Sequence, residues 1–238
     1  MSSEISNVHP EKVGESVSSR IKTTAIYHAW ITLIATLVFL FFHSVALFTS
    51  TVAVSFLLFY LVNRQGWKSL GRIGGYANAF TLLRLMVLLA LCAFHQYVHH
   101  YLITAIALLI IIGDGIDGYL ARKYNAASIF GEYFDAETDA FFVLSLGIIL
   151  FDRQMVGEWI LIPGLLRYGY MIILPVVKAR HHVKGSSFIR QLVGIWLMSA
   201  LMISFITKPE VYVPNLIIAI MMVSISFIVD FWLLLYSK

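Results

Sequence analysis

The segment Ile110–Asp139, with the sequence IIIGDGIDGYLARKYNAASIFGEYFDAETD, contains six acidic residues, four of which are aspartates in apolar stretches. These aspartates are Asp114, Asp117, Asp135 and Asp139. Charged residues are expensive inside a membrane and usually mark a functional site. The segment therefore predicts helices that pack within a bilayer around a cluster of carboxylates.

The composition of the whole chain indicates that a bilayer is its solvent. Of the 238 residues, 60% are hydrophobic and 13% are charged, and the mean hydropathy is +0.84. These values lie far from those of a water-soluble domain. The single cysteine, Cys92, lies in an apolar stretch and has no disulfide partner, so we expect it to be a core residue.

About eight apolar stretches are long enough to cross the hydrocarbon core as helices. We expect an all-α integral membrane protein with a core of six transmembrane helices, preceded by two additional N-terminal helices. The expected spans are 26–47, 49–63, 79–96, 101–123, 132–151, 157–177, 190–206 and 212–236.

The distribution of polar and apolar residues divides the chain into four parts. Residues 1–24 are polar and predict a cytoplasmic tail, and residues 25–64 carry the two additional helices. Residues 65–78 mix basic, aromatic and glycine residues, which suits either a segment lying on the membrane surface or an ordinary connector. Residues 79–238 form the predicted six-helix domain.

The basic residues predict the orientation, because lysine and arginine next to membrane spans tend to stay in the cytoplasm. With eight spans, thirteen of the seventeen fall on one side, Arg153 and Lys208 on the other, and Arg84 and Arg167 within spans. This predicts a multi-pass protein of the cell inner membrane, with its N-terminus and aspartate cluster facing the cytoplasm. A nucleic-acid partner is not expected, because the charges follow helix ends rather than one soluble surface.

The spacing of the aspartates predicts that they converge. Asp114 and Asp117 share one face of a helix, and Asp135 and Asp139 share a face of the next. A short polar stretch joins the two helices, which favours an antiparallel hairpin. The midpoint of Asp117 and Asp135 falls at position 126 and that of Asp114 and Asp139 at 126.5, so each pair is expected at one depth.

Four neighbouring carboxylates repel one another unless they take up protons or bind cations. Oxygen ligands suit hard divalent ions, so we expect Mg2+ or Mn2+. Such an ion commonly bridges phosphate oxygens, which predicts a diphosphate in the substrate.

The pattern Asp114-x2-Asp117-Gly118-x2-Ala121-Arg122-x8-Gly131-x3-Asp135-x3-Asp139 resembles the complete signature of the CDP-alcohol phosphotransferase family. Asn78-x2-Thr81-x2-Arg84 resembles the start of the family's first core helix, although Ala77 stands where a proline is common. The resemblance implies a membrane enzyme of phospholipid synthesis. It would transfer a substituted phosphate group from a CDP-linked donor to an alcohol and release CMP.

The resemblance also implies roles for individual residues. The four aspartates would hold two divalent ions, bridged by the donor diphosphate, and Asp139 would be the general base for the acceptor hydroxyl. Small residues in the signature would let the donor approach the helix backbones, although small residues also serve close helix packing in membranes. A homodimer is a further implication. The implied contacts of the CDP group are Asp117, Gly118, Ala121, Arg122, Gly131 and Asp135.

The acceptor pocket has no comparable motif. Glycerol 3-phosphate, serine, inositol and inositol phosphate all fit a CDP-diacylglycerol donor, and diacylglycerol fits a CDP-amino alcohol donor. Arg167 and the basic run that contains Lys184 favour a phosphorylated acceptor, and hence phosphatidylglycerophosphate synthesis. Glu132 and Glu137 count against it, because they add negative charge near the site.

Two other classes share parts of this chemistry. An intramembrane prenyltransferase also uses aspartate motifs with Mg2+. Its two motifs lie in widely separated parts of the chain, however, whereas those of this sequence lie in one hairpin. A divalent-cation transporter could use four intramembrane carboxylates, but it predicts a polar path to the far side of the membrane. The stretches beyond the cluster are apolar, which favours a site open on one side only.

Overall fold

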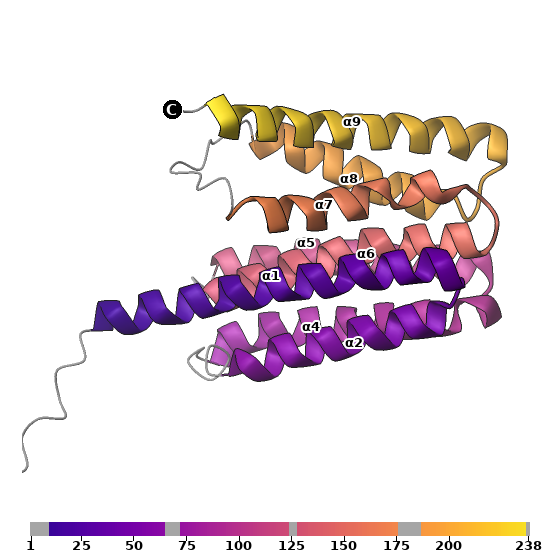
Figure 1. The fold of residues 1–238 in the computed structure, drawn as a ribbon. Helices are drawn as coiled ribbons and strands as arrows, with labels where there is room; N and C mark the ends of the chain where they lie inside the picture. The colour runs from indigo at the N-terminus through magenta and orange to yellow at the C-terminus, as the bar shows by residue number, and fades with distance from the viewer. Residues whose placement is uncertain (1–9, 65–71, 124–127, 176–186, 237–238) are drawn as a thin grey trace, which may run out of the picture.

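A computed structural model describes the backbone of residues 10–64, 72–123, 128–175 and 187–236, and side chains within 17–64, 78–113, 115, 128–175 and 190–233. The described residues form helices and no strands (Figure 1). The α-helices are α1 (Pro10–Phe42), α2 (Val45–Val62), α4 (Arg72–Phe94), α5 (His100–Lys123), α6 (Ile129–Asp152), α7 (Ile162–Ile173), α8 (Ser187–Ile203) and α9 (Pro209–Tyr236). Two short 3-10 helices are η1 (His95–Tyr97) and η2 (Glu158–Leu161).

The all-α prediction is confirmed, and each expected apolar segment overlaps one of these helices. Helix α1 begins at Pro10, inside the expected tail 1–24. Within the part of the chain that the structure describes, four helical segments are long and apolar enough to cross a membrane: Val17–Phe42, Val45–Val62, Asn78–Tyr97 and Pro209–Leu233. Helix α6 carries Asp135 and Asp139, and α7 is only 12 residues long. The count of eight spans therefore stays a prediction.

The helices run alternately in opposite directions along one bundle axis (Figure 1). Helix α5 ends and helix α6 begins at the same end of the bundle, which is where α4 also begins. At the opposite end, α1 and α2 join through a tight turn in which His43 has a φ of 50°. The Ser44 hydroxyl caps α2 by accepting a hydrogen bond from the Leu47 backbone N–H at 3.3 Å.

Helix α6 lies at the centre of the bundle and packs against α1, α4, α7 and α8. Most of its side chains from Ala140 to Leu150 are buried. Phenylalanine rings connect it to α2, since the ring centroids of Phe59 and Phe130 lie 5.8 Å apart and those of Phe56 and Phe141 lie 5.6 Å apart. The two N-terminal helices are therefore part of the packed core.

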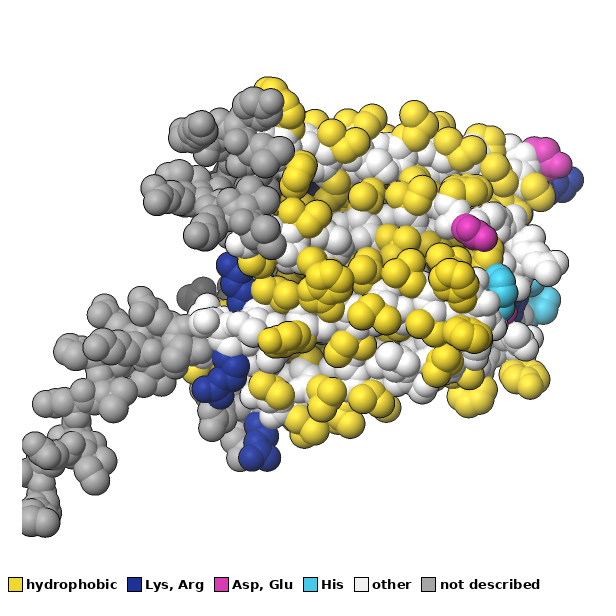
Figure 2. All heavy atoms as spheres, viewed as in Figure 1, with side chains coloured by type: hydrophobic (Ala, Val, Ile, Leu, Met, Phe, Trp, Pro, Cys, Tyr) yellow, Lys and Arg dark blue, Asp and Glu magenta, His cyan; other side chains and the backbone are white. Residues whose placement is uncertain are grey.

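Apolar side chains cover the middle of the face shown in Figure 2, along the full width of the bundle. Basic side chains gather near the end where α6 begins, and histidine and acidic side chains lie near the other end. An apolar band with charges at both ends is the surface expected of a bundle surrounded by lipid.

Close contact between α6 and α7 depends on Gly164. A Cβ at this position would lie 2.9 Å from Leu144 Cδ1 and 3.1 Å from Leu144 Cβ, whereas a Cβ at Gly169 of the same helix would meet nothing within 4 Å. We expect Gly164→Ala to overpack this contact and to lower the free energy of unfolding by about 1–3 kcal/mol. Gly169→Ala should be neutral or stabilising, because alanine favours helices.

The measurement is the thermal unfolding midpoint of both variants in detergent. A Gly164→Ala protein as stable as the Gly169→Ala protein would show that the two helices do not need this close approach.

Candidate active site

The predicted aspartates occupy two adjoining helix ends. Asp114 and Asp117 lie in the last turns of α5, and Asp135 and Asp139 lie in the first turns of α6. The structure describes the side chains of Asp135 and Asp139. Those of Asp114, Asp117, Gly118, Ala121 and Arg122 lie outside the described side chains, and Lys184 lies outside the described residues altogether.

Arg84 of α4 holds Asp135 and Asp139 together. Its Nη1 donates to Asp135 Oδ1 at 3.1 Å, and its Nη2 donates to Asp139 Oδ1 at 2.7 Å. The arginine is 4% exposed, whereas the two carboxylates are 42% and 30% exposed. A planar guanidinium suits two acceptors at once, so Arg84 fixes the carboxylates one helical turn apart.

Helix α4 also approaches both aspartate helices closely. A Cβ at Gly131 of α6 would lie 2.8 Å from Asn78 Oδ1, and a Cβ at Gly113 of α5 would lie 2.6 Å from the Phe80 ring. Gly113 directly precedes Asp114. The absence of a side chain at Gly131 therefore serves packing against α4, and its expected contact with the donor stays a prediction.

The described part of the site suits a hard divalent ion, since carboxylate oxygens are the donors that Mg2+ and Mn2+ prefer. Asp135 and Asp139 are partly exposed and share one face of α6. Among the side chains that the structure describes, no group of three or more metal-binding residues occurs. The expected four-carboxylate cluster needs the two aspartates of α5, whose side chains are not described.

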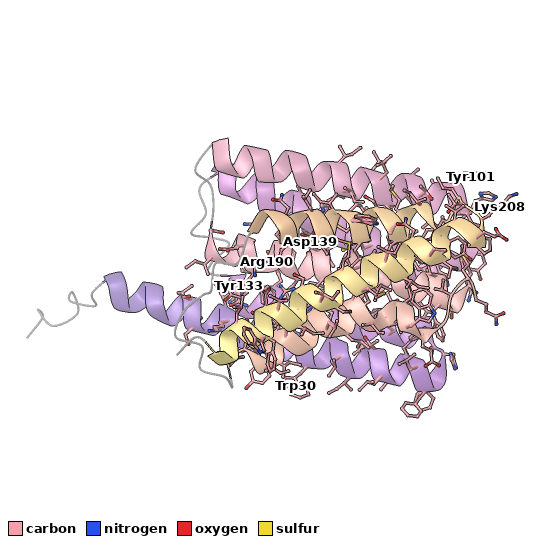
Figure 3. All side chains as sticks on the ribbon, turned by 90° about the horizontal axis from the view of Figure 1, so that it is seen from above. Trp30, Tyr101, Tyr133, Asp139, Arg190 and Lys208 are labelled. Atoms are coloured by element: carbon pink, nitrogen blue, oxygen red, sulfur yellow. The ribbon has the colours of Figure 1, made fainter. Side chains whose placement is uncertain are left out.

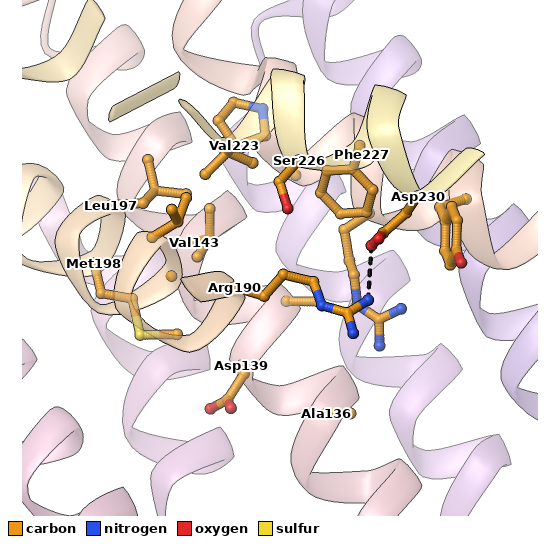
Figure 4. Close-up of a pocket in the computed structure, with 17 residues that line it drawn as sticks. Ala136, Asp139, Val143, Arg190, Leu197, Met198, Val223, Ser226, Phe227 and Asp230 are labelled. Carbon is orange, nitrogen blue, oxygen red and sulfur yellow. Dashed lines mark hydrogen bonds and ion pairs between the residues drawn. The ribbon is translucent and has the colours of Figure 1, made fainter. Parts of the chain in front are cut away.

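A cavity of about 400 Å3 adjoins Asp139 between α6, α7, α8 and α9 (Figure 4). Its wall is largely apolar, with Val143, Leu197 and Phe227 among the lining residues. The polar part of the wall contains Arg167 of α7, Arg190 of α8 and Asp230 of α9. The cavity thus brings together two carboxylates, two guanidinium groups and a space suited to an apolar chain.

Arg190 and Asp230 form an ion pair in this wall, with Arg190 Nη1 2.8 Å from Asp230 Oδ2 (Figure 4). Arg190 and Asp139 lie toward the same end of the bundle, far from Lys208 (Figure 3). Of these residues, Arg167 was expected from the sequence at the site, whereas Arg84, Arg190 and Asp230 were not. The Asn78-x2-Thr81-x2-Arg84 pattern carried a signal for Arg84; nothing in the sequence distinguished Arg190 from other basic residues at helix ends.

The histidines after α4 lie at the opposite end of the bundle. His95 Nε2 is 2.9 Å from Asp152 Oδ2, and its Nδ1 is 2.8 Å from the Cys92 carbonyl oxygen. Arg153 donates to the His95 and Val98 carbonyl oxygens. These bonds tie the α4–α5 connection to the end of α6, away from Asp139. Cys92 is buried, as expected.

Comparison with known proteins identifies the family of the chain. The sequence model of the CDP-alcohol phosphatidyltransferase family matches residues 75–232, which is more than half of the chain. No curated protein and no solved structure matches significantly. The match begins inside α4, so α1 and α2 lie outside it.

The chain belongs to the CDP-alcohol phosphatidyltransferase family. It is therefore a membrane-bound phosphotransferase of phospholipid biosynthesis that transfers a substituted phosphate group from a CDP-alcohol to an acceptor. Enzymes of this family generally use divalent metal ions.

Arg84 should be needed for both stability and activity. Arg84→Gln would keep hydrogen-bond donors but leave two neighbouring carboxylates without their common positive charge. We expect the free energy of unfolding to fall by about 1–3 kcal/mol. This is less than the roughly 3–5 kcal/mol expected when one partner of a fully buried pair is removed, because both carboxylates are partly exposed.

Thermal unfolding and CMP release test this prediction, with Arg64→Gln as the matched control, because Arg64 is exposed and lies two residues after the end of α2. An Arg84→Gln protein with the stability and activity of the Arg64→Gln protein would contradict the assigned role.

Proposed function

We propose that this enzyme transfers the phosphatidyl group of CDP-diacylglycerol to glycerol 3-phosphate, forming phosphatidylglycerophosphate and releasing CMP. The single observation that supports this proposal most is the place of Asp139. Its carboxylate bonds to Arg84 beside Asp135 and also lines the cavity that contains Arg167 and Arg190. A general base is needed at the boundary between the donor phosphate and the acceptor hydroxyl.

In the proposed reaction, Asp139 takes the proton of the acceptor hydroxyl, whose oxygen attacks the β-phosphorus of the donor. The bond between this phosphorus and the oxygen that bridges to CMP breaks, so the products are the new phosphodiester and CMP. Arg84 holds Asp139 at its place next to Asp135. Gly118, Ala121, Arg122 and Gly131 would contact the CDP group, with the Arg122 guanidinium directed to a phosphate.

Asp114, Asp117, Asp135 and Asp139 are the proposed ligands of two Mg2+ or Mn2+ ions. When bound, these ions neutralise negative charge on the diphosphate and on the departing CMP.

The guanidinium groups of the cavity support a phosphorylated acceptor. Arg167 and Arg190 both lie in the wall that also contains Asp139, and each can bind a phosphate with two parallel hydrogen bonds. The apolar remainder of the wall suits an acyl chain instead, which keeps a CDP-amino alcohol donor with a diacylglycerol acceptor as the second candidate. Lys184 is a further proposed phosphate contact.

For the membrane arrangement, we propose eight spans in the inner membrane, with the aspartates facing the cytoplasm. The basic residues support this orientation, because lysines and arginines concentrate at the helix ends near the aspartates. A homodimer remains part of the proposal from the family resemblance.

The roles of the aspartates predict two distinct defects. Asp139→Asn should keep donor binding but lose turnover, because the amide cannot accept the proton. Asp114→Ala should lose both, because it removes a proposed metal ligand. Donor binding is measured with CDP and Mn2+, and turnover as CMP release; a fully active Asp139→Asn enzyme would remove the base assignment.

The substrate assignment is tested by CMP release from the purified protein in detergent with Mg2+ or Mn2+ and CDP-diacylglycerol. Glycerol 3-phosphate, serine, inositol and inositol phosphate are added one at a time. We expect release with glycerol 3-phosphate, abolished by EDTA. Release only with another acceptor, or only with CDP-amino alcohols and diacylglycerol, would replace the assignment.

A further inference from the structure

Glu137 lies between the two site aspartates in sequence but on the opposite side of helix α6. At about 100° per residue around the helix axis, Glu137 is roughly 160° from each of the two aspartates, which are themselves only about 40° apart. Glu137 is 1% exposed, and neither of its carboxylate oxygens has a hydrogen-bond partner among the described residues. A buried carboxylate of this kind is costly and needs a positive or hydrogen-donating neighbour.

Two such neighbours face Glu137 from different helices. Arg167 Nη2 of α7 lies 4.0 Å from Glu137 Oε1, and His28 Nε2 of α1 lies 3.9 Å from Glu137 Oε2. Within the described residues, Glu137 supplies the only carboxylate within 4.0 Å of the Arg167 guanidinium. Both distances are ion-pair distances rather than hydrogen bonds, and a small side-chain movement would close either one.

Arg167 connects this buried group to the cavity. It is 28% exposed and lines the same wall as Asp139. Arg167 therefore borders both the Glu137 carboxylate and the proposed acceptor cavity. A carboxylate behind a planar guanidinium fixes the orientation in which the remaining N–H groups are presented.

Helix α1 completes the arrangement. His28 is buried, and its Nδ1 lies 2.7 Å from the Ser55 hydroxyl oxygen of α2. If Ser55 donates to Nδ1, the imidazole carries its proton on Nε2, the nitrogen that faces Glu137. The ring is also packed 4.2 Å from the Phe56 ring, centroid to centroid. The two helices outside the family match thus contact the active-site helix through a polar group.

We propose that Glu137 is a positioning residue that orients Arg167 toward the acceptor, and that His28 of the N-terminal helix pair supports Glu137 from behind. This inference rests on the proposed function only for the identity of the acceptor. The contact between Glu137 and Arg167 can be tested without any substrate.

The first test is a double-mutant cycle on thermal stability with Glu137→Gln, Arg167→Gln and the double variant, in detergent. Removal of one partner of a buried pair leaves the other uncompensated. We therefore expect each single variant to lower the unfolding midpoint, and the double variant to lower it by less than the two shifts added together. Additive shifts would show that the two residues do not interact and would overturn the proposal.

The second test separates positioning from a purely structural role. With CDP-diacylglycerol and glycerol 3-phosphate, Glu137→Gln should raise the acceptor KM by roughly tenfold to hundredfold and leave the donor KM within about twofold. Arg167→Gln should raise the acceptor KM at least as much, and adding Glu137→Gln to it should change little further. Glu210→Gln, at an exposed site in the first turn of α9, is the matched control.

His28→Leu should raise the acceptor KM in the same direction, and His28→Gln, which keeps an N–H donor, should raise it less. An acceptor KM equal to that of the wild type in Glu137→Gln would overturn the positioning role. If glycerol 3-phosphate gives no CMP release, the proposed acceptor is wrong. The kinetic comparison then uses whichever acceptor is active, and the stability cycle still decides whether Glu137 and Arg167 are paired.

Discussion

The ion pairs of Arg84 with Asp135 and Asp139 are the constraint on which the rest of the site depends. Two carboxylates one turn apart in a membrane helix repel each other, and a buried guanidinium between them offsets that repulsion. The pairs also fix helix α4 against α6, where Asn78 fills the space above Gly131. The contact between α4 and α6 therefore both offsets the repulsion between the two aspartates and packs the two helices closely together.

The functional groups are distributed over both faces of α6. The aspartates face α4 and the cavity, while Glu137 is buried on the other side beside α1 and α7. Because other helices pack around α6, a change near Glu137 on one face of the helix can affect Asp135 and Asp139 on the other face. The two helices outside the family match, α1 and α2, pack against helices that lie within it.

Sequence reasoning predicted most of the fold, because long apolar stretches have few alternatives to helices in lipid. It also placed Asp135 and Asp139 on one face, since four-residue spacing determines that locally. It could not predict that Arg84 bonds to both or that Arg190 pairs with Asp230, because these contacts depend on which helices are neighbours. Helical periodicity likewise could not show that Glu137 lies near His28, which belongs to a helix more than one hundred residues earlier in the chain.

In the proposed mechanism, carboxylates of α5 and α6 bind the divalent ion on which phosphate transfer depends. Electron paramagnetic resonance of Mn2+ in the presence of CDP tests it most directly, with the purified wild-type and Asp135→Ala proteins compared at equal concentration. We expect the wild type to bind Mn2+ and the Asp135→Ala protein to lose most of this binding. Equal Mn2+ binding by both proteins would contradict the account.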